Sequence, residues 1–133
     1  WEVERGLALT ADQVTAAQEG RTRWYEAVRR FMDVYDFLIL PSAQVFPFDK
    51  GLRWPDEVGG RRMDTYHRWM QTVIPVTMAG LPALNVPAGF DPAGRPTGIQ
   101  IVGPNHGELA CLQLGAAYDA ASSWVRRYPP PVE

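Results

Sequence analysis

Three serines are the side chains in this sequence that could attack a carbonyl carbon in acyl transfer. Ser42 directly follows Pro41 at the end of an apolar run, which is a common place for a site residue. No G-x-S-x-G turn surrounds it to expose the hydroxyl and supply oxyanion donors. Ser122 and Ser123 lie beside Trp124 at the end of a helical pattern, where hydrogen bonding to the helix end is the better explanation. We therefore expect no catalytic serine in this chain.

The remaining reactive residue types are also isolated from one another. Neither His67 nor His106 has a second His, Cys or carboxylate at a metal-ligand spacing, so we expect no metal site. Lys50 is the only lysine, and its place in a loop beside Asp49 favours a solvated charge over a catalytic base. Cys111 lies in a helical pattern, where a small buried side chain is the common case. The residues alone contain no convincing catalytic set, and no cofactor motif.

Composition excludes several classes of partner. Thirteen Lys and Arg against 15 Asp and Glu give a net charge of −2, without a basic cluster for nucleic acid or an anionic membrane. The most apolar window, residues 73–90, contains three prolines and so is not a membrane span. A single cysteine fits a reducing compartment, which predicts a cytoplasmic protein. An apolar fraction of 46% in 133 residues is enough for the core of one domain.

The first half of the chain predicts a helix that leads into a buried strand. Residues 10–32 begin with a capping box of Thr10 and Gln13, and apolar residues then recur at helical spacing. Residues 35–40 form a short apolar run stopped by proline, which predicts a strand buried on both faces. Residues 41–60 follow as a loop rich in glycine and proline.

The second half predicts helices over residues 62–79, strands over 83–87 and 97–102, and a final helix over 106–122. The turn residues between the two strands suit a loose hairpin, in which Gly89 or Gly94 should require a positive φ angle. Helices that alternate with buried strands indicate an α/β fold, in which strands of a mixed sheet pack against helices.

Five segments together resemble the C-terminal part of the amidase signature family, and the last of them, residues 109–124, is similar to the family's final helix. The most specific are AGLPALNVPAGF at residues 79–90 and GRPTGIQIVG at 94–103. YDFLILP at 35–41 is similar to a strand of the family's sheet, and YHRWM at 66–70 to its next helix. The resemblance covers nearly the whole chain and implies that residues 1–133 are the last third of one larger amidase domain, an interpretation that the absence of an initial Met fits.

The resemblance implies an enzyme that hydrolyses linear amides with a Ser-Ser-Lys catalytic set. That set precedes this region in family members and has no counterpart here, so we expect no catalytic residue and no activity from this chain alone. The resemblance places four residues at the acyl pocket as substrate-binding candidates: Phe46, Trp69, Met70 and Thr77. Because no charged residue stands at positions 69 and 70, the pocket should prefer a neutral, apolar or aromatic acyl group.

Two hypotheses remain open from the sequence. In the first, the chain supplies sheet scaffold and part of the acyl pocket to an amidohydrolase with a small amide as substrate. In the second, it is a non-catalytic binding module whose exposed strand face docks a partner. A Gly/Ser-rich stretch and a lysine encoded ahead of Trp1 would decide for the enzyme. In the first case, exposed strand edges should make the chain self-associate.

Overall fold

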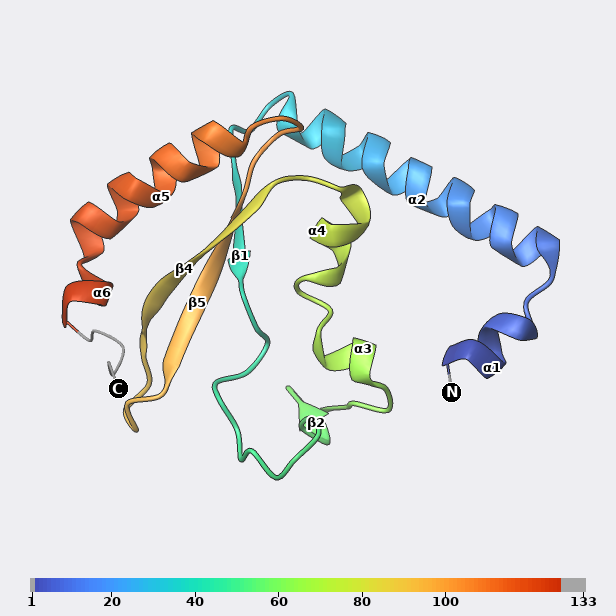
Figure 1. Ribbon diagram of the computed structural model, residues 1–133, viewed down its shortest axis with the longest axis horizontal. Coiled ribbons are helices and arrows are strands. Elements are labelled where there is room, and N and C mark those ends of the chain that lie inside the picture. Colours follow the sequence, from blue (N-terminus) through green and yellow to red (C-terminus); the bar gives the residue numbers. More distant parts are fainter. Residues whose placement is uncertain (1, 128–133) are drawn as a thin grey trace.

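A computed structural model describes residues 2–127, and its longest element is the helix α2 (Ala11–Met32) (Figure 1). The predicted capping box is confirmed: Thr10 Oγ1 accepts from Gln13 N–H at 3.2 Å, and Gln13 Oε1 accepts from Thr10 N–H at 2.9 Å. Each end therefore satisfies a donor that the first helical turn leaves without a partner. A short helix α1 (Glu2–Leu7), which the sequence did not predict, precedes it.

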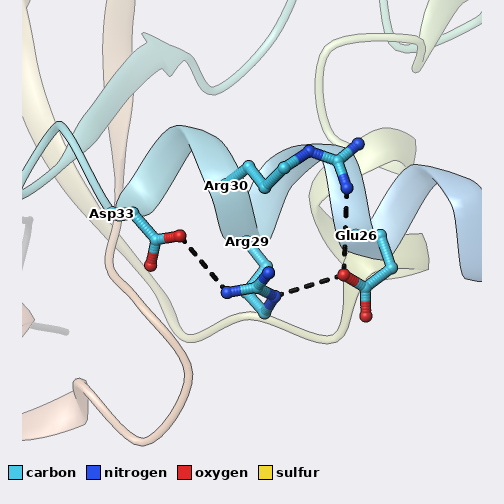
Figure 2. Close-up of polar contacts among 4 residues, drawn as sticks. All are labelled: Glu26, Arg29, Arg30 and Asp33. Atoms are coloured by element: carbon cyan, nitrogen blue, oxygen red, sulfur yellow. Dashed lines mark hydrogen bonds and ion pairs between the residues drawn. The ribbon is translucent and has the colours of Figure 1, made fainter.

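The C-terminal turns of α2 carry a network of ion pairs at its surface (Figure 2). Arg29 lies 3.2 Å from Glu26 and 3.2 Å from Asp33, and Arg30 lies 4.0 Å from Glu26. The hydrogen bond to Glu26, followed by the charge of Asp33, raises the pKa of Arg29 above its usual value. Because all these side chains are exposed, water screens the attraction and the network adds little to stability.

A three-stranded antiparallel sheet follows, with strand order β1-β5-β4. The strands are β1 (Leu38–Pro41), β4 (Ala83–Phe90) and β5 (Pro96–Val102). Ile101 and Val102 of the central strand are each 1% exposed, so the core is centred on β5. The predicted α/β class is confirmed, and the described strands pair only in antiparallel fashion.

The prediction that the first strand is buried on both faces is wrong. β1 alternates between half-buried and exposed residues, and Ile39 is 54% exposed. The helix α5 (Glu108–Ser122) packs mainly against β4, two strands away from β1. The outer side of β1 therefore has no cover from the described part of the chain, although Leu38 and Leu40 on its other side face α2.

The β4–β5 hairpin has the backbone that the glycine positions predicted. Gly89 has φ 125° and Gly94 has φ 77°, so both adopt conformations that suit glycine. The pairing register shifts between Pro87 and Gly89, which marks a bulge. A β-carbon on Gly89 would lie 3.4 Å from the ring of Trp124, the first residue of the short helix α6 (Trp124–Arg127). The absence of a side chain at Gly89 thus lets the indole of Trp124 pack against the backbone there.

Close approach to the sheet fixes the position of α5. A β-carbon on Gly115 would overlap Leu84 Cδ2, so glycine lets this helix lie close to β4 without a shift of the Leu84 side chain. Cys111 is 2% exposed beside Gly103, and burial raises the pKa of its thiol. The helix begins at residue 108, two residues later than predicted, because a turn closed by Gly107 N–H and the Pro104 carbonyl comes first.

The stretch between β1 and β4 contains only short elements. A two-stranded ribbon of β2 (Glu57–Val58) and β3 (Arg61–Arg62) lies within and just after the predicted loop. The helical region expected at residues 62–79 consists of two separate helices, α3 (Tyr66–Trp69) and α4 (Ile74–Ala79). Proline stands in the first turn of α4, where its missing N–H costs no hydrogen bond.

α4 connects this stretch to α2. Trp24 Nε1–H donates to the Pro75 carbonyl at 2.8 Å, and Arg21 Nε–H donates to the Met78 carbonyl at 3.1 Å. The sheet consequently lies between α5 on one face and the α2–α4 pair on the other (Figure 1). Within residues 2–127, the longest helices are too short or too polar to cross a bilayer.

Candidate functional site

A groove of about 590 Å³ opens where β1 ends, and we call it the aromatic groove. One wall is the segment that follows β1, in which Phe46, Pro47 and Phe48 line the space. Trp69, at the end of α3, lies across from them, and its ring meets that of Phe48 edge-on at 5.7 Å. Large rings therefore form much of its surface.

The floor of the groove is the end of the sheet, and Gly98 of β5 makes room for two polar side chains. A β-carbon on Gly98 would lie 2.7 Å from Ser42 Oγ and 3.2 Å from Asn85 Oδ1. Ser42 N–H donates to the Gly98 carbonyl at 2.9 Å, which extends the pairing of β1 with β5 by one residue. The hydroxyl and amide thus reach the groove from the strands on either side of β5.

A buried amide supports this floor from below. Gln100, 5% exposed, donates through Nε2 to the Pro41 carbonyl at 3.0 Å and to the Thr72 carbonyl at 2.8 Å. It thereby joins the end of β1 to the turn between α3 and α4. The sequence-based prediction did not single out Gln100, although a lone amide between Ile99 and Ile101 was a usable signal.

Two of the four predicted pocket residues line the aromatic groove together. Phe46 comes from the segment after β1 and Trp69 from α3. Met70 is half-buried at the end of α3, and Thr77 is an exposed residue of α4 whose hydroxyl donates to the Val73 carbonyl at 3.3 Å. Neither belongs to the groove lining. For all four residues a substrate contact remains a prediction.

The aromatic groove has no reactive centre of its own among residues 2–127. Its described lining contains no charged side chain. Ser42 is the only serine there, and no His, Lys or carboxylate of the described residues hydrogen-bonds to it. In the same part of the chain, no three His, Cys, Asp or Glu side chains converge to hold a metal ion. This arrangement suits recognition of a neutral group.

Comparison with known proteins identifies the family. The family model described as Amidase matches residues 3–112, which is most of the chain. The chain therefore belongs to the amidase family. Its described fold agrees, because solved amidase signature enzymes contain the same arrangement of helices and sheet.

Curated relatives of the chain include glutamyl-tRNA(Gln) amidotransferase subunits A. The chain is 35% identical over 114 residues to a glutamyl-tRNA(Gln) amidotransferase subunit of Myxococcus xanthus (strain DK1622), covering 86% of this chain and 22% of the relative. The corresponding protein of Nostoc punctiforme is 34% identical over 113 residues. The chain thus spans about a fifth of the length of these curated relatives.

Solved structures extend the match over nearly the whole chain. A bacterial aryl acylamidase of the amidase signature family superposes with a TM-score of 0.84 at 25% identity, covering 98% of this chain and 28% of that one. A 6-aminohexanoate cyclic dimer hydrolase superposes with a TM-score of 0.75 at 26% identity, covering 96% and 28%. This chain therefore corresponds to one region of each larger enzyme.

Proposed function

We propose that this chain supplies the sheet scaffold and part of the acyl pocket of an amidohydrolase that cleaves linear carboxylic amides to an acid and ammonia or an amine. The observation that carries the proposal is the aromatic groove, formed where three strands and α3 converge in a chain of the amidase family. Pockets for small ligands are typically apolar concavities with a few polar groups, here Ser42 and Asn85.

The lining of the groove favours a neutral aromatic acyl group. A charged group would lose its hydration inside the groove without gaining a partner, which is costly. A flat ring can instead pack against Phe46 and Trp69, as aromatic side chains pack against one another.

Binding of benzamide to the 133-residue chain tests this assignment. Aromatic contact predicts saturable quenching or enhancement of Trp69 fluorescence, measured in a variant whose other four tryptophans are phenylalanine. Phe46→Ala should weaken binding by about fivefold, since an aromatic contact is worth about 1 kcal/mol. Phe31→Ala is the matched control, because Phe31 stacks on Tyr35 beside β1 and outside the groove. Equal loss in both variants would refute the assignment.

The chemical step is assigned to a Ser-Ser-Lys set outside this chain. Residues 2–127 place no base beside Ser42, so the isolated chain should not hydrolyse benzamide or acetanilide. Turnover that disappeared in Ser42→Ala would contradict this division of labour. Met70→Ala and Thr77→Ala test the other two pocket candidates by the same binding measurement.

Self-association in the cytoplasm completes the proposal. The accessible surface of 9924 Å² exceeds the roughly 7,000 Å² expected for a compact monomer of 14.9 kDa. Exposed apolar residues contribute to the excess, including Leu109 at 68% and Leu112 at 57% on α5. Sedimentation at micromolar concentration should show a dimer or larger species. A monomer with cooperative unfolding would favour the independent binding module instead.

A further inference from the structure

The turn of the β4–β5 hairpin is built around a single buried carboxylate. The side chain of Asp91 is only 6% exposed. Its oxygens accept from Ala93 N–H at 2.9 Å, from Arg95 N–H at 2.8 Å and from Arg95 Nε–H at 2.7 Å. The backbone closes the same turn, since Asp91 N–H donates to the Arg95 carbonyl at 3.0 Å. The Arg95 guanidinium is therefore held at its base.

From this base Arg95 reaches across to the wall of the aromatic groove. Its Nη1–H donates to the Pro47 carbonyl at 3.1 Å, joining residues 48 positions apart. Pro47 stands between Phe46 and Phe48, and all three line the groove. The hairpin turn thus holds the middle of the aromatic wall through one side chain.

The other attachments of this wall lie nearer its start. Ser42 N–H bonds to the Gly98 carbonyl, and Gln44 Nε2–H donates to the Arg68 carbonyl at 3.3 Å. Beyond these, the edge-on contact between Phe48 and Trp69 spans the groove itself and would be altered by any ligand entering there. The hydrogen bond from Arg95 to the Pro47 carbonyl attaches this wall at its middle, and a ligand can enter the groove without breaking that bond.

We propose that Asp91 and Arg95 act as a clasp that sets the width of the aromatic groove and so selects flat aromatic acyl groups over branched aliphatic ones. The inference rests on the proposed function of the groove. Arg95 is a positioning residue, because it acts on the substrate only through Pro47. Arginine suits the task because one end of its planar fork can bind the carboxylate while the other donates to the carbonyl.

Two variants remove the clasp, and a third serves as control. Arg95→Ala removes the side-chain bonds to the Asp91 carboxylate and to the Pro47 carbonyl. Arg95→Lys keeps a positive charge near Asp91 but has a single nitrogen in place of the planar fork. Arg53→Ala is the control. Arg53 lies in the same loop as Pro47, but its guanidinium lies over the Trp54 ring, 5.6 Å from the centroid. Thermal unfolding of each variant shows that the chain still folds.

The first readout needs no ligand. Backbone ¹⁵N order parameters at Val45, Phe46 and Phe48 should fall from about 0.85 to about 0.6 in both Arg95 variants and stay unchanged in Arg53→Ala. Unchanged values in Arg95→Ala would overturn the clasp.

The second readout compares benzamide with pivalamide, a branched aliphatic amide. We expect the dissociation constant of benzamide to rise by about tenfold in Arg95→Ala, because a wall of two rings must then be ordered on binding. Pivalamide should bind equally or better, so the preference for benzamide falls. A general loss of stability would weaken both ligands alike, and that result would overturn the selection of flat groups.

The two readouts separate failure of the clasp from failure of the groove assignment. If the wild-type chain binds neither amide while the order parameters fall in the Arg95 variants, the proposed function and the selectivity are both refuted, and the attachment of the wall stands. If the wild-type chain binds benzamide but Arg95→Ala leaves both the order parameters and the binding preference unchanged, the clasp is refuted and the groove stands.

Discussion

Two Asp–Arg pairs separated by four residues behave differently in this molecule. In α2, Arg29 and Asp33 lie on an open helix surface with side chains 48% and 61% exposed. In the hairpin, Asp91 is 6% exposed, accepts backbone N–H groups as well as its arginine, and lies at a turn of fixed shape. The comparison shows that burial and backbone donors, rather than the spacing of opposite charges, decide whether an ion pair organises its surroundings.

The largest change in the free energy of unfolding should come from Gln100, whose buried amide, like the Asp91 carboxylate, holds backbone groups of the sheet region in place. Gln100→Leu leaves the carbonyls of Pro41 and Thr72 without their donor. We expect a loss of about 3 kcal/mol in the free energy of unfolding, because each unpaired buried acceptor costs about 1–3 kcal/mol. Urea denaturation measures it. Gln113→Leu on the exposed side of α5 is the control, and an equal loss there would contradict the anchor role.

A matched pair of valines compares the two regions directly. Val102→Ala removes methyl groups from a residue that is 1% exposed in β5, and should cost about 2 kcal/mol through lost burial and a cavity. Val14→Ala makes the same change in α2 at a residue that is 46% exposed, and should cost less than about 0.5 kcal/mol. Similar values from chemical denaturation would show that α2 is packed as firmly as the sheet.

Acid should affect the hairpin pair. The hydrogen bond from Arg95 N–H, followed by the other contacts of the arginine, lowers the pKa of Asp91 below its ordinary value of about 3.9. Since the folded pKa is the lower one, the stabilisation is present above the ordinary pKa and disappears as the pH falls through the folded pKa. We expect Asp91→Asn to reduce the difference in stability between pH 6 and pH 3. An identical pH profile in variant and wild type would contradict this.

The smallest effect should come from the helix pair. Arg29→Ala removes both ion pairs of the network in Figure 2 that involve this arginine, yet these groups are well solvated. We expect no measurable shift in the unfolding midpoint at 0.15 M salt. If Arg29→Ala were clearly less stable than the wild type at low salt, and high salt removed the difference, this network would stabilise the fold as the hairpin pair does.

The sequence predicted features that depend on neighbouring residues. The capping box at Thr10 and the positive φ angles at Gly89 and Gly94 follow from local chemistry, and the structure confirms them. The helices expected within residues 62–79 are the two short helices α3 and α4, and a hydrogen bond from Gln100 to the Thr72 carbonyl holds the turn between them. Helical periodicity gives no signal of this long-range hydrogen bond.

The groove was harder to predict than the elements that form it. Phe46 and Trp69 were placed together by family resemblance, since neither spacing nor composition relates residues so far apart. The Arg95–Pro47 contact joins two turns 48 residues apart, and no local pattern encodes it. Exposure of Ile39 was missed for the same reason, because an apolar run does not show which of its faces another element covers.

The reactivity of Cys111 can report on the opening of this fold. It is the only cysteine in the sequence, and its buried thiol packs where α5 meets the end of the sheet. Alkylating reagents react with an accessible thiolate, so the Cys111 thiol can be alkylated only after α5 moves away from the sheet. The rate of alkylation in the native chain therefore reports how often α5 detaches, and a fast rate would mark it as the first element to leave.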